Sequence, residues 1–233
     1  MRRGSWSPTC STRPPAAARQ PRSRAVRWSR AMLFLARTGC QWHYLPERYG
    51  AWSAAWAQWR RWRANGVWER AMARLAAVVR VLHDREPLPS MVMIDAQTVR
   101  GARYGPTFHA AGGRGDRTIG TKRSMLAEIL GLPVAAHAGS ARPHDVTAAR
   151  ELLRQHLPDL PRLRAIVGER ASRGLAKLAA RKRVRLDVKA RPPGQSGFVP
   201  MAPLYRIEHA IAQLGRWRRL SRCYEGTEAS ARA

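Results

Sequence analysis

The spacing of apolar residues predicts helices in the first third of the chain. Across residues 24–38 the apolar side chains recur at helical intervals, and Gly39 follows where a helix-ending glycine is expected. A second helix is marked by four tryptophans that share one face, Trp52, Trp56, Trp59 and Trp62. Asn65 and Gly66 interrupt this helix, and a third amphipathic helix is expected over 67–82. We expect the tryptophan face to be packed in a core. Two helices joined by a short turn have the general form of a small DNA-binding module.

The rest of the chain alternates short apolar runs with helical segments. The expected strands cover 91–95, 163–167 and 184–188, together with a β-hairpin formed by 124–130 and 134–138. The expected helices cover 145–156, 174–183 and 204–224. Asp145 stands at the start of the first of these helices, where its side chain can act as the N-cap. Helices and strands that alternate after an antiparallel start predict an α/β domain with a mixed sheet.

Three segments are therefore expected along the chain. Residues 1–22 are rich in Pro, Ser and Arg, which predicts a disordered basic tail. Residues 23–84 should form a small all-α module of the helix-turn-helix type. The prolines within 85–90 mark a linker, and residues 88–233 should form the α/β domain, with helices flanking its sheet.

The charge then narrows the class of partner. The chain of 233 residues carries 43 Lys and Arg against 15 Asp and Glu, a formal net charge of +28, and all but four of the basic residues are arginine. Such a charge favours a polyanion, with nucleic acid first and an anionic membrane surface second. No apolar run is long enough to cross a bilayer, and the best helical faces are rich in tryptophan rather than suited to lie on a membrane.

The cysteines do not suggest a metal or disulfide framework. Cys10, Cys40 and Cys223 are isolated from one another, and none has a histidine pair at ligand spacing. A protein of the reducing cytosol fits this usage.

Three carboxylates occupy positions suited to a site. Asp95 and Glu169 each end or follow a predicted strand, and Glu208 lies in the first turns of the last predicted helix. Ligands of α/β proteins usually bind at strand ends. Three carboxylates that meet there would repel one another, and divalent cations with hard oxygen ligands, Mg²⁺ or Mn²⁺, are the natural counter-charge. Two such ions can stabilise the attacking and leaving oxygens of a phosphoryl transfer.

Each of the three acids also has an ordinary interpretation when it is taken alone. Asp95 can cap the end of its strand, and Glu169 can pair with Arg170 or Arg173 at the surface. Glu208 can form a pair with a neighbour one turn away on its helix. The site hypothesis therefore depends on all three acids meeting at one place.

Four stretches, in chain order, carry a resemblance to a known family. They are 38–46 with the Trp/Arg helix after it, 94–99, 168–174, and 205–210 running into 214–220. Together they resemble insertion-sequence transposases of the DDE class, whose catalytic domain has a ribonuclease-H-like fold. The resemblance implies a metal-dependent enzyme that nicks transposon ends and joins the 3′-hydroxyls to target DNA.

The resemblance also assigns roles to residues and partners. Asp95 would ligate both of two Mg²⁺ or Mn²⁺ ions, Glu169 one of them and Glu208 the other. The DNA partners would be the terminal inverted repeats and the target duplex, held by a homodimer in the bacterial cytoplasm, at the nucleoid. Six basic residues are candidates for DNA contact: Arg60, Arg61, Arg63, Lys122, Arg123 and Arg206.

The chain departs from the family pattern in ways that keep two alternatives open. Glu169 stands where the family has aspartate, and its extra methylene moves the carboxylate by about 1.5 Å, one carbon–carbon bond. Ser172 replaces an aromatic residue, Leu204 a basic one, and the chain ends at Ala233, where related chains continue into another helix. The alternatives are a remnant that binds DNA without cutting it, and a structure-specific nuclease that cuts without joining.

Overall fold

The computed structural model describes residues 24–101, 109–110, 119–190 and 201–225. The expected tail at 1–22 lies outside these ranges, and so does most of the segment from 100 to 120. The α-helices are α1 (Arg24–Thr38), α2 (Trp52–Ala64), α3 (Val67–Leu82), α4 (Asp145–His156), α5 (Ala176–Arg181), α6 (Tyr205–Gly215) and α7 (Arg218–Ser221). No helix in the described ranges is both long enough and apolar enough to span a bilayer.

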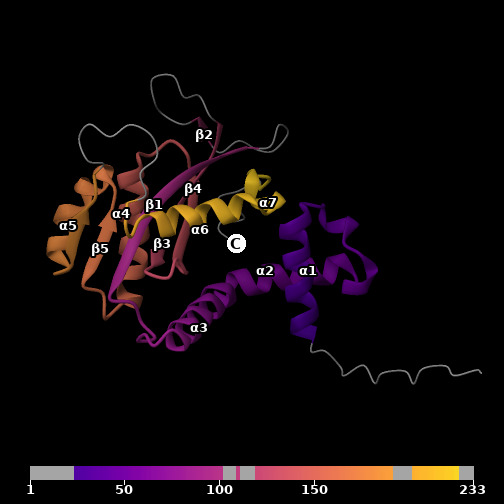
Figure 1. The fold of residues 1–233 in the computed structure, drawn as a ribbon. Helices are drawn as coiled ribbons and strands as arrows, with labels where there is room; N and C mark the ends of the chain where they lie inside the picture. Colours follow the sequence, from indigo (N-terminus) through magenta and orange to yellow (C-terminus); the bar gives the residue numbers. More distant parts are fainter. Residues whose placement is uncertain (1–23, 102–108, 111–118, 191–200, 226–233) are drawn as a thin grey trace, which may run out of the picture.

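One mixed sheet organises the second part of the chain. Its strands are β1 (Met91–Arg100), β2 (His109–Ala110), β3 (Ile119–Glu128), β4 (Pro133–Ser140), β5 (Ala165–Gly168) and β6 (Arg185–Val188). The strand β1 is central: it is antiparallel to β3 and parallel to β5, and β6 continues the parallel half. β2 and β4 both pair with β3. The predicted α/β domain with a mixed sheet and an antiparallel hairpin is confirmed (Figure 1).

Alternation along β1 divides the core into two layers. Val92 and Ile94 are buried against α4 on one face, while Met93 is buried on the other face with Ile207 of α6. Successive side chains of a strand point to opposite faces, so a continuous apolar run predicts a strand covered on both sides. Figure 1 shows α6 lying across one face of the sheet, with α4 and α5 on the opposite side.

The strand β1 is longer than predicted, and the last helix is shorter. β1 continues to Arg100 because β3 offers it antiparallel partners along its polar second half. Gly120 permits this pairing, since a Cβ there would lie 2.0 Å from the Val99 carbonyl oxygen. The single helix expected over 204–224 instead ends at Gly215, and α7 begins after Trp217, whose backbone is extended.

The start of α4 differs from the predicted capping. His144 is the N-cap, because its Nδ1 accepts a hydrogen bond from the Val146 amide at 3.4 Å. Asp145 is the first residue of the helix and lies 2.7 Å from the Lys122 Nζ. A carboxylate in the first turn is favoured by the helix dipole, so Asp145 stabilises the helix start without capping it.

The tryptophan face of α2 is only half buried in the helical module. Trp59 packs against Trp42, with ring centroids 5.7 Å apart, and Trp62 packs against Trp68 at 5.6 Å. Trp52 and Trp56 instead remain 44% and 37% exposed. The expectation that this face is core is therefore wrong for the first pair, and the second pair is only partly buried. The buried centre of the module consists of Ala31, Leu35, Leu45 and Ala55.

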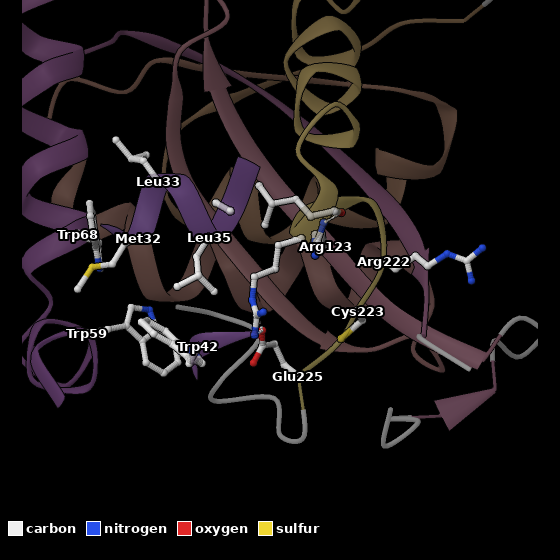
Figure 2. A pocket seen from close by; sticks show the side chains of 13 residues that line it. Met32, Leu33, Leu35, Trp42, Trp59, Trp68, Arg123, Arg222, Cys223 and Glu225 are labelled. Carbon is white, nitrogen blue, oxygen red and sulfur yellow. Dashed lines mark hydrogen bonds and ion pairs between the residues drawn. The ribbon is translucent and has the colours of Figure 1, made fainter. Parts of the chain in front are cut away.

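The helical module is in contact with the end of the described chain. α7 packs on α1, and Arg219 of α7 donates to the Cys40 carbonyl. Between them lies a largely apolar cavity of about 250 Å³, which Figure 2 shows with Trp42, Trp59 and Trp68 on one side and Cys223 on the other. The Cys223 amide donates to the Arg100 carbonyl at 2.8 Å, which ties this segment to the end of β1.

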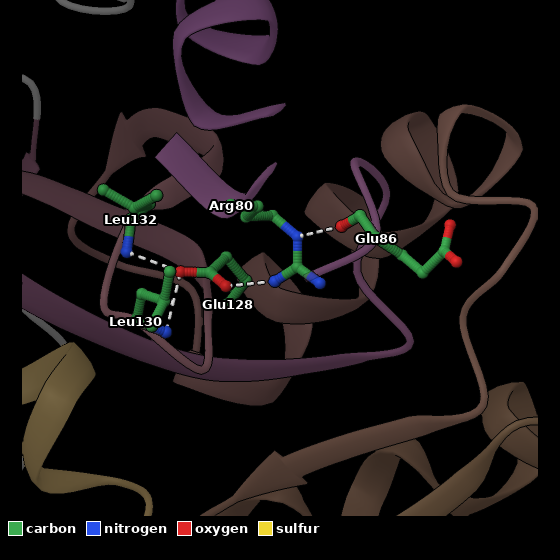
Figure 3. Close-up of polar contacts among 5 residues, drawn as sticks. All are labelled: Arg80, Glu86, Glu128, Leu130 and Leu132. Carbon is green, nitrogen blue, oxygen red and sulfur yellow. Dashed lines mark hydrogen bonds and ion pairs between the residues drawn. The ribbon is translucent and has the colours of Figure 1, made fainter. Parts of the chain in front are cut away.

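A buried ion pair joins the module to the sheet at the opposite end of β1. Arg80 of α3 and Glu128 of β3 form a salt bridge, and their side chains are 6% and 0% exposed. Figure 3 shows the other polar contacts: Glu128 accepts from the amides of Leu130 and Leu132, and the Arg80 Nε donates to the Glu86 carbonyl at 2.8 Å. Because nearly every polar atom of the pair has a partner, two charges can remain inside the protein.

Removal of one partner of this pair should be strongly destabilising. Arg80→Ala leaves the Glu128 carboxylate buried without its cation, and we expect the free energy of unfolding to fall by about 3 to 5 kcal/mol. Urea denaturation followed by circular dichroism measures the change. The matched control is Arg162→Ala, which breaks an exposed ion pair to Glu86 and should cost less than about 1 kcal/mol. Equal losses in the two variants would contradict a structural role for the buried pair.

Candidate active site

The register between β1 and β5 brings Asp95 next to Glu169. The parallel pairing matches Met93 with Val167 and Ile94 with Gly168, so Asp95 and Glu169 follow as the next residues of the two chains. Met93 and Val167 belong to the core under α6. By alternation, the two carboxylates leave the sheet on that same side, toward the helix that carries Glu208.

The turn after β5 depends on a glycine. A Cβ at Gly168 would lie 2.2 Å from the Ser172 Oγ and 3.1 Å from a methyl of Ile94. The Ser172 amide donates to the Glu169 carbonyl at 2.8 Å, which closes the turn into the short helix at 170–175. Ser172 therefore covers the backbone beside Glu169, and only glycine at 168 leaves room for it.

A small cavity of about 50 Å³ lies beside Asp95 on the α4 side of the sheet, where Val146 and Ala149 line it. Three carboxylates line it: Asp95, Glu169 and Asp145 of α4. Sequence reasoning assigned Asp145 only to helix capping, and the fold reveals its place beside Asp95. Glu208 is not among the residues that line the cavity, although its charge acts on Asp95.

The environment of Asp95 disfavours its charged form. The pKa of Asp95 is raised from 3.8 to about 6, and burial is the largest cause. The Ala96 amide donates to the Oδ1 of Asp95 at 2.7 Å, which opposes the shift in this pKa. The charges of Glu169, Glu208 and Asp145 contribute to the raised value as smaller causes. The three predicted acids thus share one electrostatic environment, and a cation would relieve their repulsion.

The chemistry of the donor set fits a hard divalent cation. All of the candidate donors are carboxylate oxygens, which suit Mg²⁺ or Mn²⁺ rather than zinc or copper. In the described part of the chain, no three His, Cys, Asp or Glu side chains already lie close enough together to hold a metal ion. The acids would have to move closer together to share one ion.

Two of the six predicted DNA-contacting residues have other roles. Lys122 is buried, and its Nζ is occupied by Asp145 and by the Pro143 carbonyl. Arg123 is half-buried beside the 250 Å³ cavity, donates to the Leu220 carbonyl, and has its pKa lowered by burial. Both side chains lie on β3 and hold neighbouring elements in place, and their contact with DNA stays a prediction.

The other four predicted DNA contacts are more accessible. Arg60 and Arg61 are exposed on α2. Arg63 is half-buried, with its guanidinium 5.2 Å from the Trp59 ring centroid. Arg206, beside Glu208, is half-buried and lies 5.3 Å from the ring centroid of its neighbour Tyr205. Their role in DNA binding stays a prediction.

Neutralisation of Asp95 should stabilise the protein at neutral pH. The folded protein holds the Asp95 proton more tightly than the unfolded chain, so this group lowers the free energy of unfolding as the pH rises from about 4 to 6. Asp95→Asn should therefore raise the free energy of unfolding at pH 7.5 by about 1 to 2 kcal/mol, allowing for solvent screening. The gain should disappear at pH 4.

Urea denaturation at several pH values tests this expectation. The control is Glu151→Gln on the exposed side of α4, which should change stability little at any pH. A gain for Asp95→Asn that is the same at pH 4 and pH 7.5 would rule out the electrostatic cause.

Comparison with known proteins places the first part of the chain beside a transposase family. Residues 5–72 match a family model described as "Putative transposase of IS4/5 family". The matched residues include α1, α2 and the first turns of α3, and they end before the sheet that carries the acids. An uncharacterized protein of Sinorhizobium fredii, y4sN, is 35% identical over 96 residues, which are 41% of this chain and 66% of that protein. The chain is thus similar to transposases of the IS4/5 family in its helical module.

Proposed function

We propose that this chain is a DNA transposase of an insertion sequence, which cuts transposon ends and transfers the strands to target DNA. The observation that carries the proposal is the environment of Asp95, where burial and the charges of Glu169, Glu208 and Asp145 act together. A helical module similar to the IS4/5 family precedes this site in the chain. The net charge of +28 suits a DNA substrate.

The mixed sheet supports a ribonuclease-H-like catalytic domain in this proposal. Its central strand β1 carries the first acid, the adjacent parallel strand β5 leads to the second, and α6 across one face carries the third. Acids from three elements can meet at one end of such a sheet although 113 positions of sequence separate Asp95 from Glu208.

Asp95, Glu169 and Glu208 would hold two Mg²⁺ or Mn²⁺ ions. When bound, the ions would supply charge stabilisation for the phosphoryl transfer. The chain's own groups prepare the site. The Ala96 amide orients the Asp95 carboxylate. Lys122 pairs with Asp145, so one of the acids near Asp95 has its charge balanced by a cation of the chain itself. In this proposal a homodimer holds paired ends, and the exposed arginines of α2 hold the phosphates of the duplex.

A strand-transfer assay tests the proposed function. With a duplex that carries the matching terminal inverted repeats and Mg²⁺ or Mn²⁺, we expect cleavage and joining, and Asp95→Asn should lower both by at least about 100-fold. The same variant should bind the duplex as the natural protein does, because Asp95 lies in a small cavity away from α2. Fluorescence anisotropy measures this affinity and its dependence on salt.

Other outcomes would support the alternatives instead. Salt-sensitive binding without cleavage in any divalent metal would indicate a remnant that only holds DNA. Cleavage without joining would indicate a nuclease. Either result would contradict the proposal of a transposase.

The length of the side chain at position 169 should limit the rate. Glu169 is exposed and one methylene longer than the aspartate of the family pattern, and errors of about 1 Å in a catalytic site can cost about 100-fold. We therefore expect Glu169→Asp to raise metal-dependent cleavage by about 10-fold or more in the same assay. Glu169→Gln, which keeps the length and removes the charge, should lower it. If Glu169→Asp does not exceed the natural protein, position 169 does not limit catalysis.

A further inference from the structure

We propose that the exposed face of α2, formed by Trp52, Trp56 and Arg60, binds unpaired DNA bases by stacking. The inference rests on the proposed action on DNA and adds that one surface of the helical module receives single-stranded rather than duplex DNA. We refer to these three residues as the stacking face. The arguments are the exposure of the rings, their spacing, and the charge around them.

The exposure of these two tryptophans is unusual within their own helix. The rings of Trp59 and Trp62 pack on other tryptophans, whereas Trp52 and Trp56 are 44% and 37% exposed. Complete burial of a large aromatic side chain is worth about 2 kcal/mol or more, so the fold forgoes part of that stabilisation at both positions. Neighbouring exposed apolar residues of this kind mark an interaction surface.

The spacing of the stacking face suits planar ligands. The three residues lie four positions apart, so they form one row along the helix. Four residues of α-helix rise by about 6 Å. Stacked bases lie about 3.4 Å apart, so a base between two aromatic planes needs about 7 Å between them. The rise between Trp52 and Trp56 is therefore close to the separation at which two rings can hold one base between them.

Arg60 extends the row and adds a positive charge. Its guanidinium carbon lies 4.8 Å from the centroid of the Trp56 ring, a cation–π contact. A guanidinium held flat on a ring still presents its edge donors, which can reach a phosphate of the same strand. Aromatic planes beside a cation are the combination that binds single strands without regard to sequence.

The surrounding charge favours a nucleic acid over a protein on this surface. Residues 24–66 contain eight arginines, and their only acidic residue is Glu47. The aliphatic side chains exposed on α3 offer a contrast, because Leu75, Val78 and Leu82 have no aromatic planes for bases. The stacking face is therefore a surface of this module that combines exposed aromatic rings with a strongly basic surround.

Binding to single and double strands should separate stacking from simple charge attraction. The probes are a fluorescent thymidine oligonucleotide of about 12 nucleotides and a duplex of the same length, measured by anisotropy with the full chain. The double variant Trp52→Ala/Trp56→Ala should bind the single strand at least about 10-fold more weakly and the duplex within about 2-fold of the natural protein. Bound single strand should also quench tryptophan fluorescence less in the variant.

Two further variants keep the test independent of folding. Trp52→Phe/Trp56→Phe retains aromatic planes and should bind the single strand within about 3-fold of the natural protein. Tyr44→Ala removes an aromatic ring that is 69% exposed in the same module but off this face, and it should leave both affinities unchanged. A double alanine variant that loses its thermal transition is replaced in the comparison by Trp52→Ser alone.

Several results would overturn the inference. If the double alanine variant loses the same affinity for the single strand and for the duplex, the face attracts DNA without stacking on its bases. Unchanged DNA affinities together with a lower mass by light scattering would show that the tryptophans join two copies of the chain. If the natural protein binds neither nucleic acid, the proposed function fails as well. If the tryptophan variants bind both the duplex and the single strand as the natural protein does, only the stacking face is refuted.

Discussion

The salt bridge between Arg80 and Glu128 determines how the helical module meets the sheet. Both charges are removed from water, so the loss of either side chain would leave the other charge buried without a partner, which is strongly destabilising. Glu128 lies opposite Val92 at the start of β1, and α3 therefore has one permitted position at that end of the sheet. The remainder of the module follows from α3 through the aromatic contacts of Trp62 and Trp68. The buried pair at one end of β1 and the packing of α7 on α1 at the other thus fix the position of α2 relative to the acidic cavity.

The strand β1, which pairs with the strand that bears Glu128, carries the first acid of the site. At one end β1 is held by Glu128 across the ladder, and near its middle it carries a carboxylate whose charge is disfavoured by burial. The apolar layers on both faces of β1 supply the stability that allows Asp95 to be kept there. Gly168 and Ser172 then fix the turn that brings Glu169 alongside. The stable apolar part of β1 and the disfavoured charge of Asp95 therefore lie on the same strand.

Local patterns predicted the helices α1 and α3 to the residue, because helical periodicity and the glycines that follow or precede it are encoded nearby. The features that sequence reasoning missed all depend on distant partners. The sequence predicted Lys122 as a cation available to DNA, whereas the fold pairs it with Asp145. Nothing in the sequence near Glu128 indicates that its partner is Arg80. The tryptophans of α2 have identical spacing signals, and the packing of Trp28, Trp42 and Trp68 decides which of them are covered. The approach of Asp95 to Glu169 could be expected from strand order, whereas the presence of Asp145 in the same cavity could not.

The docking of residues 218–225 on α1 has a consequence for how the protein is made. A ribosome releases the helical module first, but the cavity beside Trp42 and Trp59 is closed by Leu220 and Cys223, close to the end of the described chain. During synthesis the apolar wall of the module stays uncovered until residues 218–225 have emerged. A nascent chain of this protein therefore exposes a hydrophobic surface while the whole sheet is being made, and chaperones that bind such surfaces can reach it in that interval.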